Sequence, residues 1–377
     1  MKQPITLPFY ARLALILISI IAVGYLGILG QTILAPFILG LLFAIMLLPL
    51  ANLLEKKCRF PKSLSSAVSV FSMIIVVSVV VYFIGTQLSF LVSAWPHLEA
   101  QLTESFSSLQ QWVHHTFHIE VSKQVSYLSS LTSKAMSAST SMVTGLLVSF
   151  SGLLLFFIFT LLYTFFILVY RKRLVQFLVS SFSTEHSNVV FAIVEQTQYM
   201  VKKYITGLLT EMFAVFCLSG ILLWIVGSKF VLLLALITGI FNVIPYIGIF
   251  TALLLSAVIT FATATVIKAL FAGLAILLVH LIDSNVLMPV ILGSKVRINA
   301  LVIIIGVIVG EMLWGISGMF VAIPIIAIMK IIFDNVDSLR PWAILLGDED
   351  KDMTKKSILA RLKLRITHTK QKRNTAS

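Results

Sequence analysis

The stretch FVLLLALITGIFNVIPYIGIFTALLLSAVITFATAT, residues 230–265, decides how this chain folds. It is too long for one membrane crossing, and only the motif NVIPYIG, residues 242–248, interrupts it. The arm before the interruption reaches about 21 Å as a helix, whereas the hydrocarbon core of a bilayer is about 30 Å thick. Two short apolar arms around a proline and a glycine predict a re-entrant helical hairpin. Such a break is tolerated at membrane depth where the freed backbone groups face protein or a water-filled cavity.

Composition places the whole chain in a membrane. Of its 377 residues, 59% are hydrophobic and 11% charged, and the mean hydropathy is +1.04. A soluble globular protein carries about 25% charged residues. The apolar runs are long and do not alternate, which excludes a transmembrane barrel with its alternating segments of about 10 residues. The sequence therefore predicts an all-α polytopic membrane protein.

The net charge of +13 reflects membrane topology rather than nucleic-acid binding. Basic residues gather beside apolar runs, for example at residues 56–62, at residues 171–173 and in the tail after Lys351. That placement is typical of loops on the cytoplasmic side. The only two cysteines, Cys58 and Cys217, imply no disulfide framework.

The apolar runs predict six full transmembrane helices, at about residues 11–30, 32–52, 63–91, 146–170, 204–226 and 266–289. The first two are expected to form a tight hairpin, because almost no loop separates them. The sixth is expected to end at Pro289. With the basic clusters inside, both termini are predicted to be cytoplasmic.

A second overlong run, residues 298–333, is broken by WGISG at residues 314–318 and predicts a second re-entrant hairpin. Counted by hydropathy, the two hairpins bring the number of transmembrane segments to eight. They are expected to enter from opposite faces, which is the inverted repeat of many secondary transporters. If the arms instead cross fully, the number of crossings changes but the termini stay cytoplasmic.

Five regions are expected along the chain. They are transmembrane helices 1–3 in residues 1–92, an extracytoplasmic amphipathic helical segment in 93–144, the fourth transmembrane helix with a cytoplasmic amphipathic helix in 145–203, the transport core in 204–333, and a basic cytoplasmic tail in 334–377.

Ionisable residues inside membrane spans are costly, so each invites a functional interpretation. Asp283 lies one helical turn after His280 and close to Asn285, a grouping suited to a proton or cation relay. The alternative is a carboxylate at the cytoplasmic interface that pairs with Lys295 or Arg297.

Two further carboxylates are candidates for binding or coupling. Glu211 lies in the fifth helix, where a packing hydrogen bond is the alternative role and Lys268 is a poor partner unless both lie at the same depth. Glu311 lies just before the break of the second hairpin, where it would bind a cation or gate the pathway. Its alternatives are a turn cap or a residue in an aqueous vestibule.

The hairpin tips combine turn formers with polar groups. In the first tip Asn242 and Tyr246 offer polar contacts, while Pro245 and Gly248 shape the turn. In the second tip the glycines are Gly315 and Gly318. We expect no metal site, no cofactor and no enzymatic activity, because the chain has no metal-ligand constellation, nucleotide-binding loop or G-x-S-x-G elbow.

One ordered set of motifs carries a family likeness. It consists of Tyr204-Ile-Thr-Gly207, the segment 242–248, Asp283-Ser-Asn-Val-Leu-Met-Pro289 with Gly293, then Gly306, Gly310, Trp314-Gly315, Gly318 and Pro324. Together these resemble the autoinducer-2 exporter (AI-2E) family of bacterial membrane proteins. The sequence departs from the family pattern at Leu208, Ile249 and Asn299-Ala300, which fall in or near the expected pathway and bear on the substrate.

The resemblance implies a multi-pass permease of the bacterial inner membrane that forms homo-oligomers with a movable transport part. The first hypothesis is a secondary transporter that moves a small polar molecule, such as the signal autoinducer-2, by alternating access. The alternative is a sodium(lithium)/proton antiporter on the same scaffold. A membrane scaffold that recruits partners through residues 93–144 and 171–203 is the third hypothesis. The expected partners are the substrate or cation, the lipid bilayer and further copies of the chain.

Overall fold

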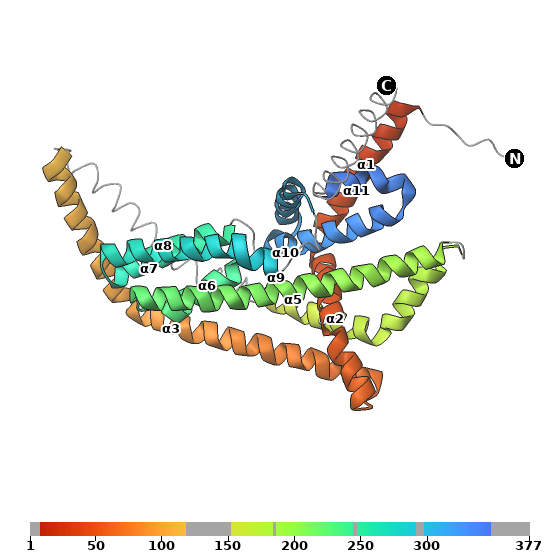
Figure 1. Cartoon of the computed structure of the whole chain (residues 1–377), viewed down its shortest axis with the longest axis horizontal. Coiled ribbons are helices and arrows are strands. Elements are labelled where there is room, and N and C mark those ends of the chain that lie inside the picture. The colour runs from red at the N-terminus through yellow and green to blue at the C-terminus, as the bar shows by residue number, and fades with distance from the viewer. Residues whose placement is uncertain (1–7, 118–151, 184–185, 244–246, 292–297, 348–377) are drawn as a thin grey trace, which may run out of the picture.

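The computed structural model describes residues 8–117, 152–183, 186–243, 247–291 and 298–347. Within these ranges the regular structure is helical, apart from one isolated bridge between Ile298 and Gly347. Figure 1 shows an elongated bundle in which the long helices α3, Lys62–Phe117, and α5, Ser187–Val226, run along the molecule. Helix α2, Gln31–Lys57, crosses them.

Six described helices are long and apolar enough to cross a membrane, by length and composition: Gln31–Lys57, Lys62–Gln87, Gly152–Ser180, Ser187–Val226, Val266–Ile291 and Ala300–Asn335. Six is also the predicted number of full spans, but the helices counted here are not the same six that the sequence predicts. The first predicted span, α1 at Phe9–Leu29, is not among them. The second predicted hairpin is counted instead, as the single long helix α10, Ala300–Asn335.

The predicted tight hairpin between the first two helices is not formed. Gly30 alone separates α1 from α2, and the helical hydrogen bonding resumes at once, with Leu34 N–H donating to the Gly30 carbonyl at 2.8 Å. Figure 1 shows α1 running down into α2 rather than folding back on it. A single glycine provides a bend, whereas an antiparallel pair of helices needs a connection of about 2–5 residues.

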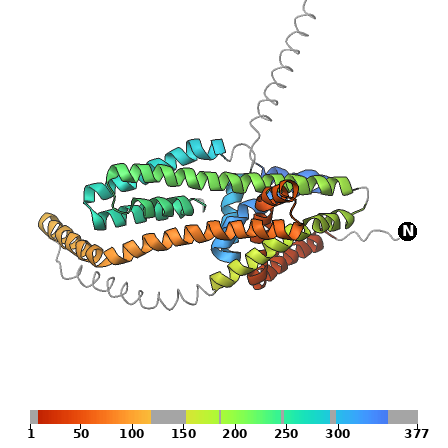
Figure 2. The same cartoon turned by 90° about the horizontal axis from the view of Figure 1, so that it is seen from below.

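Two helices extend well beyond their predicted ends. Helix α3 continues to Phe117, so the backbone of residues 93–117 is a direct extension of the third span; residues 118–151 lie outside the described ranges. Figures 1 and 2 show α3 bending in its second half, the part that contains Pro96. Proline is a common cause of such bends. Helix α5 likewise joins the predicted cytoplasmic helix to the fifth span without a break.

The stretch 230–265 forms two short helices, α6 at Val231–Phe241 and α7 at Ile247–Thr263, which pack against each other. Residues 244–246 between them lie outside the described ranges. The turn requires a glycine at position 248, because a Cβ atom there would overlap the carbonyl oxygen of Phe241. The predicted break of the helix in this stretch is confirmed.

The second stretch also folds back on itself. Within α10 the backbone is non-helical at Trp314 and Gly315, and Gly315 has a φ of 60°, which favours glycine. The two arms approach so closely that a Cβ atom on Gly318 would overlap the carbonyl oxygen of Gly310. Trp314 Nε1 donates a hydrogen bond to the carbonyl of Gly27 in α1 at 2.9 Å. This second tip is therefore attached to the first helix.

Three apolar cores hold the helices together. One joins α2, α5 and α10, the second joins α2, α3 and the helix Gly152–Ser180, and the third joins α5, α6, α7 and α8, Val266–Ile282. Helix α5 thus contributes to the first core through residues 200–208 and to the third through Leu223. Glu211 lies between these two parts of α5, at the point where the first core ends and the third begins.

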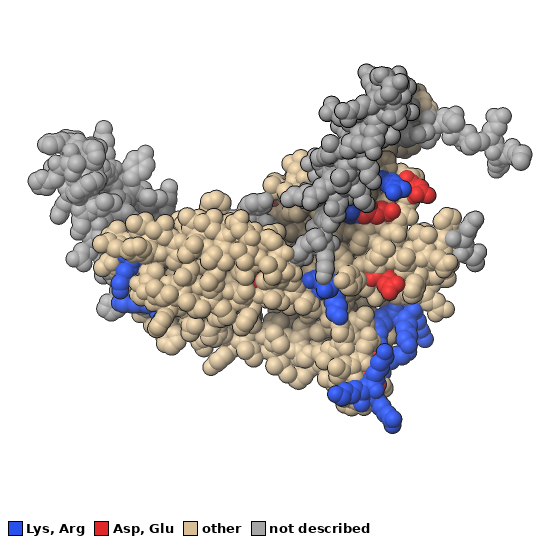
Figure 3. Space-filling view, in the orientation of Figure 1, with Lys and Arg blue, Asp and Glu red and all other residues tan. Residues whose placement is uncertain are grey.

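The described part of the predicted tail is ordered against the bundle. A 3-10 turn at Asp337–Leu339 leads into α11, Arg340–Leu346, and Asn299 N–H donates to the Leu346 carbonyl at 3.0 Å. Figure 3 shows that apolar and neutral residues cover most of the elongated face, while Lys and Arg gather mainly at one end. Such a distribution suits a protein embedded in a bilayer.

Candidate functional site

Three of the predicted site residues meet in the structure. The side-chain nitrogen Nδ2 of Asn242 donates a hydrogen bond to Asp283 Oδ2 at 3.2 Å and lies 3.5 Å from Glu211 Oε1, at the outer limit for a hydrogen bond. Since both carboxylates contact one nitrogen atom, they are close neighbours. The tip of the α6–α7 hairpin therefore joins two acidic groups from different helices.

Each element reaches this point for a local reason. Glu211 lies inside α5 and faces inward, since only 5% of it is exposed. Asn242 caps the carboxyl end of α6, where the helix stops before Pro245. Proline disfavours helical backbone in the residue before it, so the end of α6 is set by sequence. The amide is left at the hairpin tip, directed at the carboxylates.

Asp283 begins a π-helical turn, Asp283–Leu287, in which Met288 N–H bonds to the Asp283 carbonyl. Pro289 has no N–H for the carbonyl four residues earlier, and its ring would clash with that carbonyl in an α-helix. A wider turn accommodates the proline, so the prediction that the helix ends at Pro289 is wrong: α9 continues through Met288–Ile291. Such π-bulges are frequent at functional sites.

The two carboxylates are buried and incompletely satisfied. Asp283 is 6% exposed, and Asp283 Oδ1 and Glu211 Oε2 have no hydrogen-bond partner within the described part of the chain. Two negative charges about 4 Å apart repel by about 4 kcal/mol at an effective dielectric constant of about 20. A buried pair of this kind is stabilised by a proton or by a cation. Carboxylate oxygens are the kind of ligand that hard cations prefer.

A small cavity of about 10 Å³ adjoins Asp283. His280 lines it together with Asp283 and Asn242, and the imidazole also lies 3.3 Å from Ser284 Oγ through Nε2. Thr238 lines the same cavity and was missed at the sequence level. The available signal was its spacing, since Thr238 lies one helical turn before Asn242 on the same face of α6.

Other predicted residues lie apart from this site. Asn285 is exposed and donates to the Leu281 carbonyl, and Glu311 is exposed on α10. Tyr246 and Pro245 lie outside the described residues, as do the alternative Asp283 partners Lys295 and Arg297.

Lys268 does not neutralise Glu211. Its Nζ lies 3.2 Å from the Cβ position of Gly227, which is about 24 Å further along α5 at about 1.5 Å per residue. No lysine or arginine in the described ranges forms a salt bridge with Glu211 or Asp283.

Comparison with known proteins agrees with this architecture. Residues 13–338 match the family model described as AI-2E family transporter. The chain is 24% identical to the AI-2 transport protein TqsA of Escherichia coli over 85% of this chain and 91% of TqsA. It is 22% identical to the putative transport protein YhhT of the same organism, over 84% and 88% of the two chains.

A more similar but shorter match is the putative transport protein YrrI of Bacillus subtilis, 31% identical over 36% of this chain. The match spans only 38% of the length of YrrI. The family match, in contrast, covers nearly the whole chain, including both hairpins and every residue of the carboxylate site. This chain belongs to the AI-2E transporter family.

Proposed function

We propose that this protein is a gradient-driven secondary transporter whose coupling site is the cluster of Glu211, Asn242 and Asp283. The observation that carries the proposal is the amide of Asn242, which joins two buried carboxylates from a hairpin tip. When the carboxylates bind a proton or a cation, the hydrogen bonds that the Asn242 amide makes to them change. Because Asn242 lies at the hairpin tip, the charge of the site is linked to the position of the hairpin. Such a link is what alternating access requires.

The transported molecule under this proposal is small and polar, with export of a signal such as autoinducer-2 as the leading case. The name of TqsA supports this substrate. The departures at Leu208, Ile249 and Asn299-Ala300 leave the specificity of this chain to experiment.

A sodium(lithium)/proton antiporter is the second candidate. The unpartnered oxygens Glu211 Oε2 and Asp283 Oδ1 favour it, because two carboxylates able to exchange a proton for a small cation need no organic ligand.

The topology that fits both functions has six full spans and two hairpins that enter the membrane from opposite faces, with 204–333 as the transport core. Both termini are cytoplasmic in this arrangement, and the protein lies in the bacterial inner membrane. We further propose that the protein forms a homo-oligomer. Contacts between subunits keep the assembly together while the transport core of each subunit moves. Cysteine accessibility tests the orientation: reagents that reach position 246 only from the cytoplasmic side contradict it.

The decisive experiment reconstitutes the full chain in proteoliposomes with an imposed proton or sodium gradient. Autoinducer-2 and internal pH are followed in parallel. Gradient-driven movement of autoinducer-2 supports the permease, and sodium-driven proton movement without it supports the antiporter. If neither is observed, the scaffold hypothesis is favoured. Asp283→Asn is expected to abolish either flux, and Asn285→Ala, two residues further along and exposed, serves as its matched control.

A further inference from the structure

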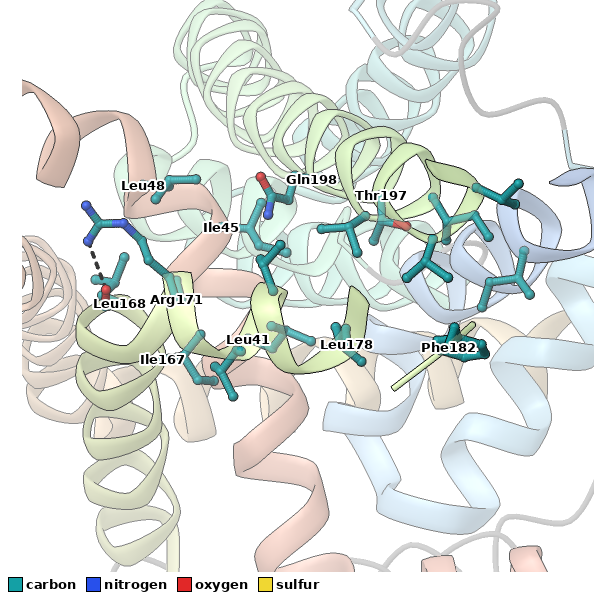
Figure 4. Close-up of a pocket in the computed structure, with 18 of the residues that line it drawn as sticks. Leu41, Ile45, Leu48, Ile167, Leu168, Arg171, Leu178, Phe182, Thr197 and Gln198 are labelled. Carbon is teal, nitrogen blue, oxygen red and sulfur yellow. Dashed lines mark hydrogen bonds between the residues drawn. The ribbon is translucent and has the colours of Figure 1, made fainter. Parts of the chain in front are cut away.

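A second cavity, of about 600 Å³, lies well away from the carboxylate site. Four elements surround it: α2, the helix Gly152–Ser180, the first half of α5 and the end of α10. Figure 4 shows the apolar side chains of these helices converging on it, among them Ile45, Leu178 and Phe182. Its size falls within the range of about 300–1,000 Å³ that is typical of small-molecule sites.

The lining is apolar except at four positions: Arg171, His186, Thr197 and Gln198. A cavity of this composition offers almost no hydrogen bonds to a polar substrate. It offers instead a long apolar surface that hydrocarbon would cover. Apolar ligands in such sites are held by burial of their surface rather than by specific polar contacts.

Exposed apolar side chains lie along the segment that forms one wall of the cavity. After the basic residues 171–173, the helix continues with Phe177, which is 66% exposed, and leads to Phe182, which is 55% exposed. Basic residues followed by exposed Phe and Leu describe a segment at the boundary between lipid headgroups and acyl chains. An acyl chain at this boundary would meet the cavity where the exposed Phe182 lines it.

The residues next to Arg171, at the end of the cavity away from Phe182, are basic. Arg171 is already neutralised, because its Nη2 donates to both carboxylate oxygens of Glu55 at 2.7 Å while Nη1 donates to the Leu168 carbonyl at 2.8 Å. Figure 4 shows this arginine at one end of the cavity. The next two residues, Lys172 and Arg173, are exposed and form no salt bridge with a described residue. Two cationic side chains at a headgroup boundary attract anionic phosphate.

We propose that this cavity is a binding site for an anionic glycerophospholipid of the cytoplasmic leaflet. One acyl chain lies between α2, α5 and the helix Gly152–Ser180, and the phosphate lies beside Lys172 and Arg173. The site also gives the bilayer a means of stabilising the packing of α2 and α10 on α5, since these helices meet at the cavity wall. The proposal is independent of the transport chemistry at Asp283.

Native mass spectrometry of the purified full chain tests it, with phosphatidylglycerol and phosphatidylcholine of identical acyl chains as probes. The wild type is expected to retain phosphatidylglycerol about tenfold more strongly than phosphatidylcholine, a difference of about 1.4 kcal/mol. The double variant Lys172→Gln/Arg173→Gln is expected to lose that preference. Lys229→Gln/Lys268→Gln, near the far end of α5, is the matched control and should keep it.

A large side chain introduced into the cavity tests whether an acyl chain binds there. Val194→Trp places a large ring in the cavity and is expected to reduce retention of both lipids about tenfold. Val258→Trp on an exposed face of α7 is the control for the added bulk. Wild-type retention in the Val194→Trp variant, or equal retention of the two lipids by the wild type, would overturn the proposal.

A second measurement needs no variant and so does not depend on folding of Val194→Trp. Phosphatidylglycerol with a diazirine near the end of one acyl chain is cross-linked to the wild type by light. The label is expected on peptides from the elements that line the cavity, which are α2, the helix Gly152–Ser180, the first half of α5 and the end of α10. Labelling confined to helices that do not line the cavity contradicts the site.

Discussion

The two hairpins are similar in hydropathy but differ in what their tips contact. The tip of α6–α7 presents Asn242 to the buried carboxylates of Glu211 and Asp283. The tip of α10 presents Trp314 to the backbone of α1, at the Gly27 carbonyl. One tip is joined to ionisable groups and the other to a neighbouring helix. Two similarly broken apolar stretches therefore do not imply two equivalent halves of a binding site.

The difference extends to the acidic residue associated with each hairpin. Glu211, which faces the first tip, is 5% exposed, whereas Glu311, which precedes the second tip, is exposed at the protein surface. Glu211 lies close enough to Asp283 for the two carboxylates to interact electrostatically, since both contact Asn242 Nδ2. We therefore assign the coupling chemistry to the first hairpin and an anchoring role to the second.

The largest effect is expected when the arms of the second hairpin are forced apart. A side chain at Gly318 would overlap the Gly310 carbonyl, so Gly318→Val should destabilise the fold by about 3 kcal/mol or more. Thermal unfolding in detergent measures the loss. Gly85→Ala is the control, because no atom beyond the neighbouring backbone of its own helix lies within 4 Å of its Cβ position. A Gly318→Val protein as stable as the control would show that the arms do not pack as described.

Removing the amide from the first tip is expected to impair transport. Asn242→Leu leaves both carboxylates without this donor, a loss of about 1–3 kcal/mol, which corresponds to a flux lower by about fivefold or more. Flux in proteoliposomes provides the measurement. Ser317→Ala, which removes a hydrogen bond to the Trp314 carbonyl at the second tip, should leave flux close to wild type. Equal losses in the two variants would remove the distinction between the tips.

The smallest effect is expected from Trp314→Phe. This change removes one hydrogen bond to α1, worth about 1 kcal/mol, and keeps an aromatic ring at the tip. The unfolding midpoint should fall slightly while flux stays near that of the wild type. A flux as low as that of Asn242→Leu would instead assign chemistry to the second tip.

Much of the fold follows from local sequence. The two arms of 230–265 form helices shorter than the six long apolar ones, and Pro245 and Gly248 mark the break that separates α6 from α7. The break at Trp314 and Gly315 follows in the same way. The bend between α1 and α2 could not be predicted, because a single glycine permits several directions and the contact with Trp314 is made far along the chain.

The site was only partly predictable. The cost of burying charge marks Glu211, Asp283 and Glu311 equally as candidates. The sequence alone does not show which of these carboxylates is buried in the folded protein. The meeting of Asn242 with residues 31 and 41 positions away depends on how the hairpin packs against α5 and α8. The rule that proline ends a helix predicted that the chain would leave the helix at Pro289. The helix instead widens into a π-helical turn at Asp283, which accommodates the proline.

The most direct test of the account compares two conservative changes in the same proteoliposome assay, Glu211→Gln and Glu311→Gln. Each removes one carboxylate charge and keeps the size of the side chain. Glu211→Gln is expected to lose gradient-driven flux by about tenfold or more, while Glu311→Gln is expected to stay within about twofold of wild type. Normal flux in Glu211→Gln, or an equal loss in Glu311→Gln, would contradict the assignment of coupling to the first hairpin.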